Sequence, residues 1–418
     1  MIYEKLTEQD RLWTDTVMNK ITEKLAAVRE RSANKIPSEA IDGVHDDKAS
    51  CEGPSGMTRT FWTNGFWAGM MWLLYQETND ERYAEIARYT ETVLGKYLLE
   101  IESHDIGYLW LPSFVLDYRL TGSKEAMESG LTAAKWLAGR YNPAGGFIRA
   151  WGSGNEALPL VKDAPPIHIA GATIIDCMLN LPLLYWASEV SKDPRFKLIA
   201  MRHADTTMNY FVRPNGSVIH IVEFNPENGV YVSDHGGQGY GKGSSWTRGQ
   251  AWGLYGFTAS YRHTGEKRYL ETAKKIAANF MANIPENGLI PSDFDQPAEP
   301  HVQDDIGACA AACGLIELAG QVPGDQKIPY LNAAVKMLRA IDAQSADWSA
   351  DTDGITQNGT TGYHLPGRNK NYVYADYFYI EAVMKLQDKG VFVNLPALLL
   401  WNITSESDPE FYLMIRFP

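Results

Sequence analysis

The feature that most constrains this fold is a short polar junction that recurs between apolar and charged stretches. Each junction has Gly or a small polar residue, then Asp, Ser or Pro, then an aromatic or apolar residue. These are the residues that commonly end one helix and begin the next. We therefore interpret the junctions as turns between helices. They occur at residues 78–83, 121–125, 191–196, 264–269 and 323–330.

The segments on the two sides of each junction differ in polarity. The first segments are rich in apolar residues, Gly and Ala, as expected of buried helices, and the second carry Lys and Glu on one face. Buried and exposed helices therefore alternate. We expect buried helices near 64–77, 112–120, 172–189, 247–263 and 304–320, and exposed helices near 81–98, 123–140, 193–213, 266–284 and 328–344.

A sixth pair requires the two ends of the chain, with 8–35 as the exposed helix and 376–387 as the buried one. Six such hairpins predict an all-α (α/α)6 barrel, with residues 1–418 as one catalytic domain. The irregular junction spacing excludes a tight solenoid. From about residue 390 we expect a C-terminal extension, either a strand or a packed segment. Long loops, where function usually lies, are predicted at 141–171, 214–246, 285–303 and 347–370.

The net charge limits the partners of the chain. A formal charge of -13 and a pI near 5.2 argue against nucleic acid and anionic membranes, which both require a basic surface. No stretch approaches the ~20 apolar residues that span a bilayer, and the first residues contain no apolar signal core. We therefore expect a cytoplasmic protein, or a periplasmic one if a signal was removed. The choice between monomer and dimer stays open.

The four cysteines, Cys51, Cys177, Cys309 and Cys313, form no disulfide framework. Cys309 and Cys313 lie one turn apart in an Ala-rich run, where packing is expected rather than metal binding. The sequence also lacks a Gly-x-Ser-x-Gly elbow, a phosphate loop and a His-Glu-x-x-His motif. The common hydrolase, kinase and zinc protease mechanisms are therefore excluded.

Two carboxylates are placed for acid–base chemistry. Asp176 lies in the apolar run 172–182, where an ionised carboxylate needs a partner or a raised pKa. Pro182 should bend the helix expected there. A helix cap or a buried structural contact is the alternative for Asp176. Asp105 precedes an aromatic stretch and equally fits a cap of the helix that Pro112 helps begin.

Two further pairs of carboxylates have structural interpretations. Asp304 and Asp305 are typical of a helix start, and Asp293 and Asp295 are typical of a loop. Loop carboxylates also suggest calcium, but their spacing matches no twelve-residue calcium loop. We therefore predict no metal.

Aromatic side chains gather near the expected starts of the buried helices. Their faces suit pyranose rings, although core packing explains any single Trp. In the segment 245–256, Arg248 and Trp252 are four residues apart and share one helix face, which suits a flat anion. The alternative is a tightly packed helix in which Arg248 pairs with a structural carboxylate. The aromatic set contains Trp62, Trp67, Trp110, Trp151, Trp246 and Trp252.

Five stretches, in order along the chain, resemble the unsaturated glucuronyl hydrolases of glycoside hydrolase family 88. They are residues 62–69, 104–108, 173–181, 245–256 and 374–381. The most specific is Trp-x-Arg-Gly-Gln-Ala-Trp-Gly in the fourth. The resemblance implies a six-hairpin barrel that removes a 4,5-unsaturated uronic acid from the non-reducing end of lyase-derived oligosaccharides. It implies no metal or organic cofactor.

The resemblance also implies roles for single residues. Asp176 would be the general acid and base that protonates C4 and directs water to C5. Asp105 would hold the ring hydroxyls and tune Asp176. The residues implied to bind the unsaturated sugar are Trp151, His220, Gln238, Arg248 and Trp252, and the aromatic set adds Trp62.

Sulfation preference and three alternative functions stay open. The segment 361–371 lacks the Ser pair with which some members of the family hold a sulfate, although Arg368 and Lys370 could meet an anionic group. The alternatives are an unsaturated rhamnogalacturonyl hydrolase, an inverting glucosidase that uses Asp105 and Asp176, and a non-catalytic oligosaccharide-binding protein.

Overall fold

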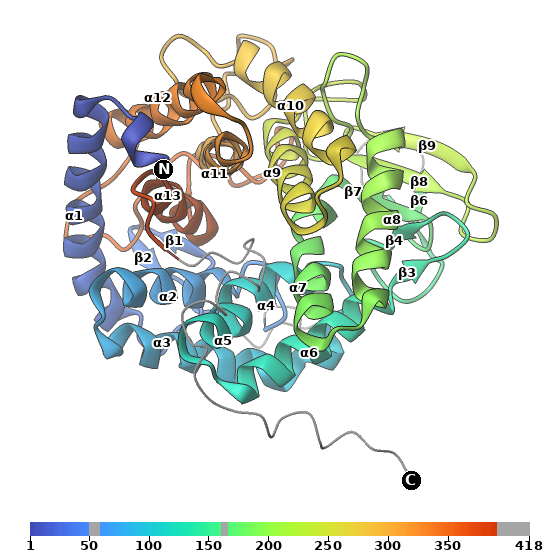
Figure 1. The fold of residues 1–418 in the computed structure, drawn as a ribbon, viewed down its shortest axis with the longest axis horizontal. Helices are drawn as coiled ribbons and strands as arrows, with labels where there is room; N and C mark the ends of the chain where they lie inside the picture. The colour runs from blue at the N-terminus through green and yellow to red at the C-terminus, as the bar shows by residue number, and fades with distance from the viewer. Residues whose placement is uncertain (50–58, 160–165, 391–418) are drawn as a thin grey trace.

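Two concentric rings of helices make up the computed structural model, which describes residues 1–49, 59–159 and 166–390. The first helix of each hairpin lies in the inner ring, and the second lies outside it (Figure 1). The (α/α)6 barrel predicted from the junctions is therefore confirmed.

The inner ring contains α2 (Phe66–Thr78), a continuous segment of α4 (Ile106–Trp110), the π-turn η3 (Leu111–Val115) and α5 (Leu116–Thr121), then α7 (Leu181–Ser191), α9 (Thr247–Thr264), α11 (Asp305–Gly320) and α13 (Val373–Leu386). The outer ring contains α1 (Glu8–Arg31), α3 (Glu81–Leu94), α6 (Lys124–Ala138), α8 (Pro194–Tyr210), α10 (Lys267–Ala282) and α12 (Ile328–Gln344). Short 3-10 turns are η1 (Tyr3–Lys5), η2 (Gly95–Glu100), η4 (Ile175–Leu179) and η5 (Gly324–Lys327).

The polar junctions end and begin helices through capping. The side chains of Asp80, Ser123 and Asp193 accept backbone N–H groups at the starts of α3, α6 and α8. Gly122 and Gly265 follow α5 and α9 with φ of 76° and 72°, a left-handed conformation that glycine adopts without strain. The interpretation of the junctions as interhelical turns is thus confirmed.

Two predicted starts of inner helices are wrong. The segment from residue 172 begins as a strand, and α7 starts only at Leu181. Pro182 lies in the first turn of α7, where its missing N–H costs no hydrogen bond, so it helps to begin the helix and does not bend it. The second inner helix begins at Ile106, and Pro112 falls in the π-turn inside it.

Small antiparallel sheets organise the loops between hairpins. One sheet has the order β10-β1-β2 and another the order β7-β8-β9, while β3 pairs with β4 and β5 pairs with β6. The strands are β1 (Glu39–Ile41), β2 (Val44–His45), β3 (Tyr141–Asn142), β4 (Phe147–Ile148), β5 (Ala157–Leu158), β6 (Ile167–His168), β7 (Ala172–Ile174), β8 (Ile221–Phe224), β9 (Tyr231–His235) and β10 (Asn371–Tyr372).

The first outer helix pairs with the last inner helix, as the sixth hairpin requires. Figure 1 shows α1 beside α13. The fully buried face of α1 contains Val17, Ile21 and Leu25. The backbone N–H groups of Ile2 and Tyr3 donate to the Asp388 carboxylate, each at 2.9 Å. These contacts close the ring.

Three of the four cysteines, Cys177, Cys309 and Cys313, are free and buried, as expected of packing residues. Cys51 and the extension predicted after residue 390 lie outside the described residues. In the described part of the chain, no helix combines the length and apolar character needed to cross a membrane.

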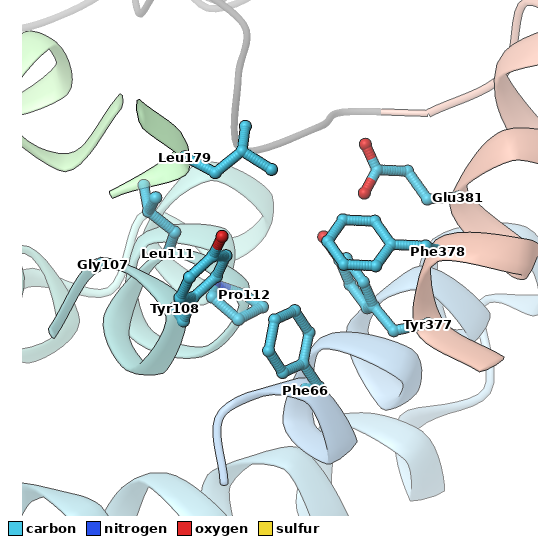
Figure 2. Close-up of a pocket in the computed structure, with 9 residues that line it drawn as sticks. All are labelled: Phe66, Gly107, Tyr108, Leu111, Pro112, Leu179, Tyr377, Phe378 and Glu381. Carbon is cyan, nitrogen blue, oxygen red and sulfur yellow. The ribbon is translucent and has the colours of Figure 1, made fainter. Parts of the chain in front are cut away.

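The barrel axis is nearly filled by aromatic side chains. Figure 2 shows Phe66, Tyr108, Tyr377 and Phe378 gathered from α2, α4 and α13. The cavity that they line has a volume of about 20 Å³. That volume is about enough for one water molecule. A sugar ring does not fit there, so this cavity is not itself a sugar-binding site.

Candidate active site

The starts of the inner helices meet at one end of the barrel. The ring of Trp62 lies 5.4 Å from that of Tyr108 and 4.7 Å from that of Tyr374. Arg248 contacts both Tyr374 and Asp304. Helix N-termini carry partial positive charge because their first N–H groups lack intrahelical partners. The helix N-termini therefore add positive potential at this end of an acidic protein.

Asp176 lies in η4, the turn between β7 and α7. The pairing of β7 with β8 continues beyond the strands, because the Ile175 N–H donates to the His220 carbonyl at 3.0 Å. This register places Nε2 of His220 3.4 Å from Oδ2 of Asp176. The side chains are only 4% and 15% exposed. Strand pairing thus creates a partly buried carboxylate–imidazole pair.

Hydrogen bonding fixes the tautomer of His220. Its Nδ1 accepts the backbone N–H of Gln238 at 3.0 Å, so the hydrogen of the neutral ring is on Nε2, facing Asp176. Among the described residues, neither Nε2 of His220 nor Oδ2 of Asp176 has a hydrogen-bond partner. Both facing atoms are therefore available to a ligand or to water.

Asp105 directly precedes α4, but its side chain does not cap that helix, so the capping alternative is wrong. Its carboxylate accepts the Ser103 hydroxyl, and Nε2 of His104 lies 3.4 Å from its Oδ1. Burial raises the pKa of Asp105 to about 7; the Ser103 hydrogen bond opposes this rise and the charge of Asp176 adds to it. Asp105 therefore exchanges a proton near neutral pH.

Asn180 joins the two carboxylate-bearing segments. Its Oδ1 accepts the N–H of Tyr108 at 2.8 Å, and its Nδ2 donates to the carbonyl of Asp176 at 3.3 Å. The Tyr108 hydroxyl donates to the same carbonyl at 3.2 Å. The backbones beside Asp105 and Asp176 are thereby held in one arrangement.

Replacing Gly107 with Ala should push these two segments apart. A Cβ at this position would lie 2.5 Å from both Cα and Oδ1 of Asn180, so α4 and η4 would have to separate. Overpacking of this kind typically costs about 1–3 kcal/mol, and we expect a lower melting temperature in calorimetry. Gly320→Ala is the control, because a Cβ there meets nothing within 4 Å. Equal melting temperatures in the two variants would contradict the prediction.

Arg248 is 2% exposed, and its guanidinium is held by protein groups. Its Nη2 donates to the carbonyls of Thr360 and Thr361 at 2.7 and 2.8 Å, and its Nη1 donates to the Tyr374 hydroxyl. Its Nε lies 3.5 Å from Oδ2 of Asp304. This pairing agrees with the alternative in which Arg248 has a structural carboxylate partner.

Gln238 and Arg248 both bind the loop that contains Thr361. Its side-chain amide donates to the Thr361 carbonyl, which also accepts from Arg248. Its backbone N–H donates to His220. One loop carbonyl therefore connects two of the residues that the sequence predicts to bind sugar.

The three candidate tryptophans have different environments. Trp62 is half-buried beside Tyr108 and Tyr374. Trp151 is half-buried and packs against a small cluster that includes Ile174 and Ile221. Trp252 is 1% exposed, and its ring lies 5.7 Å from that of Tyr108. Trp62 and Trp151 thus offer partly accessible rings, whereas Trp252 supports the site from inside the barrel.

The remaining charged candidates anchor loops. As predicted, α11 begins at Asp305, which accepts a hydrogen bond from the N–H of Asn358 at 3.1 Å. Asp293 lies in a loop, also as predicted, and accepts a hydrogen bond from the N–H of Ser245 at 3.1 Å.

The two basic candidates near residue 370 are also held by protein groups. Lys370 pairs with Glu39 at 2.8 Å, and Arg368 donates to the Tyr363 carbonyl. Across the described residues, no group of His, Cys, Asp or Glu is arranged to hold a metal.

Four residues that build the site were missed as individual candidates: Ser103, Tyr108, Asn180 and Tyr374. The sequence does indicate Asn180, because it is a polar residue in the same apolar run, 172–182, as Asp176. Ser103 gave no signal, because a serine before an aspartate is common in turns.

The model of Glycosyl Hydrolase Family 88 matches residues 28–395. The chain belongs to this family. The unsaturated glucuronyl hydrolase of Bacillus sp. strain GL1 is 37% identical over 344 residues, which cover 79% of this chain and 87% of the relative. This similarity confirms the resemblance inferred from the five sequence stretches.

Two solved structures of similar proteins extend the family match to three dimensions. The unsaturated glucuronyl hydrolase from Bacillus sp. GL1, described as responsible for the degradation of glycosaminoglycan, superposes with a TM-score of 0.80 at 32% identity, covering 90% of this chain and 97% of that one. A mutant unsaturated glucuronyl hydrolase from Streptococcus agalactiae, complexed with dGlcA-GalNAc6S, gives 0.72 at 25% identity, covering 89% and 91%. The family 88 match therefore extends over most of the barrel.

Proposed function

We propose that this family 88 protein is an unsaturated β-glucuronyl hydrolase. It removes the 4,5-unsaturated uronic acid from the non-reducing end of lyase-derived oligosaccharides. The observation that carries the proposal is the buried oxygen of Asp176, which faces His220 and lies close enough to Asp105 to influence its pKa. The names and the bound saccharide of similar proteins support the same substrate class.

The reaction is a hydration of the C4=C5 enol ether. Protonated Asp176 transfers its proton to C4, and the positive charge that develops at C5 is shared with the ring oxygen. Water adds to C5 and returns a proton to the Asp176 carboxylate, which completes the acid–base cycle. The resulting hemiketal opens to a ketone, and the hemiacetal exposed at C1 expels the remaining sugar as an alcohol.

The neighbours of Asp176 have supporting roles. The Nε2–H of His220 faces the carboxylate and orients it. Asp105 holds the hydroxyls of the sugar ring, and its pKa of about 7 lets it do so either as an acceptor or as a donor. Trp62 and Trp151 provide aromatic faces for the sugar. The positive charge of Arg248 attracts the carboxylate of the uronic acid at long range, without a direct contact.

A panel of unsaturated disaccharides tests this function directly. Hydration destroys the double bond, so near-ultraviolet absorbance should fall with glycosaminoglycan-derived disaccharides. Saturated disaccharides are the control and should release no sugar. Turnover of only the pectin-derived disaccharide would favour a rhamnogalacturonyl hydrolase. Binding without any loss of absorbance would favour a non-catalytic sugar-binding protein.

A further inference from the structure

A groove of about 460 Å³ lies outside the helical rings, between the end of α6 and the β3–β4 hairpin. Figure 1 shows β3 and β4 beside α6 and α8, away from the barrel axis. Pockets for small ligands commonly occupy about 300–1,000 Å³. The side chains that shape this groove are Trp136, Arg140, Tyr141, Asn142, Arg149 and Ser153.

Two guanidinium groups, those of Arg140 and Arg149, line the groove, and the carboxylates of Asp105, Glu102 and Glu156 act on them only through space. Arg140 donates to the carbonyls of Arg149 and Gly152 at 3.0 and 3.1 Å. Arg149 donates to the carbonyls of Trp151, Ser153 and Gly154. Carbonyls orient a guanidinium but leave its charge in place. In the part of the chain that the structure describes, neither arginine forms a salt bridge within 4.0 Å, so each guanidinium can still pair with a bound anion despite the more distant Glu102 and Glu156.

Trp136 adds a fixed aromatic face to the same groove. Its indole is 40% exposed, although it belongs to an outer helix of the barrel. Its Nε1 donates to the Ile101 carbonyl at 2.9 Å, which fixes the orientation of the ring. A rigid, exposed indole beside two cations combines the contacts that a charged pyranose needs.

The groove is separate from the proposed active site. Asp105, Asp176 and His220 are not among its lining residues, and Trp151 packs instead against the cluster with Ile174 and Ile221. Arg140 lies between the two places, because it lines the groove while its charge also acts on Asp105.

We propose that this groove binds one anionic sugar unit of an oligosaccharide, with the ring on Trp136 and its carboxylate or sulfate at Arg140 and Arg149. No double bond is needed for this contact, so saturated sugars bind as well. The choice of a glycosaminoglycan-type ligand rests on the proposed function, whereas the affinity for an anionic sugar does not.

Titration calorimetry with saturated tetrasaccharides tests the proposal. A hyaluronan tetrasaccharide carries only carboxylates, and a chondroitin 6-sulfate tetrasaccharide carries sulfates as well. Comparing their affinities therefore shows whether the groove prefers a carboxylate or a sulfate. We expect Trp136→Ala to weaken binding by about ten-fold or more, and Trp136→Phe, which keeps an aromatic face, by less than about three-fold. Arg149→Gln should reduce the salt dependence of binding. Equal affinity in Trp136→Ala and the wild type would overturn the proposal.

Two further measurements separate this groove from the active site. Turnover of an unsaturated disaccharide by Trp136→Ala should stay within about two-fold of the wild type, since Trp136 donates its hydrogen bond to the Ile101 carbonyl and not to either carboxylate of the proposed active site. Amide hydrogen exchange on the unmodified protein should show protection of residues 139–153 when the saturated tetrasaccharide is added. Protection that is absent from 139–153, or confined to 103–108 and 174–180, would refute the groove and leave the hydrolase function standing.

Discussion

Replacing Asp176 with Asn should abolish the loss of near-ultraviolet absorbance from unsaturated disaccharides while the fold stays intact. Asn has nearly the same size and can still accept a hydrogen bond, but it cannot donate a proton to C4. General acid–base catalysis typically contributes 100- to 10,000-fold, and because Asp176 serves as both acid and base we expect kcat to fall by at least about 1,000-fold. Initial rates and a calorimetric melting curve measure the two effects separately.

Asp234→Asn provides a matched control. Asp234 is a carboxylate on β9 that accepts the Tyr231 hydroxyl at 2.6 Å, and it contacts neither Asp105 nor Asp176 by any hydrogen bond in the described structure. This variant should keep near-normal turnover. If Asp176→Asn retained more than about a tenth of the wild-type kcat, Asp176 would not be the general acid.

Replacing Asp105 with Asn should lower activity and raise stability above neutral pH. The pKa of Asp105 is about 7 in the folded protein, compared with about 3.9 in an unfolded chain. The folded state therefore holds this proton more tightly, and stability is lost as pH rises from about 4 through about 7 and the buried carboxylate ionises. Asn carries no charge, so the variant avoids this loss.

Melting temperatures measured at pH 4 and pH 8 test the stability effect. We expect the variant to exceed the wild type by a few degrees at pH 8 and the difference to shrink at pH 4. Activity should fall by about 100-fold, because the ring hydroxyls lose their anchor. The ionisation near pH 7 should also disappear from the profile of kcat/KM against pH. A stability difference that does not change with pH would contradict the raised pKa of Asp105.

The helical architecture could be predicted because its determinants are local. Asp80, Ser123 and Asp193 each accept a hydrogen bond from an N–H group only a few residues later, in the first turn of the helix that they cap. Gly122 and Gly265 end helices through their own backbone conformation. Each of these signals can be read in a window of six residues. Repetition of the signal then determined the number of hairpins, and pairing of the two ends completed the barrel.

The site was harder to predict because it depends on distant pairing. His220 and Asp176 meet through the register of β7 with β8, and the apolar run around Asp176 also fits a helix. No local pattern shows that Asn180 reaches across to the N–H of Tyr108. For Arg248, the sequence supported both an anion site and a structural ion pair, and only the position of Asp304 shows that the pair forms.

The closure of the barrel by α1 and α13 has a consequence for synthesis on the ribosome. The apolar face of α1 leaves the ribosome long before α13, the helix that covers it, which begins about 340 residues later in the chain. At translation rates of about 5–20 residues per second, that face waits for tens of seconds. Chaperone demand should therefore depend on the exposed face of α1, and translation that stalls before residue 373 should yield an aggregation-prone, open ring.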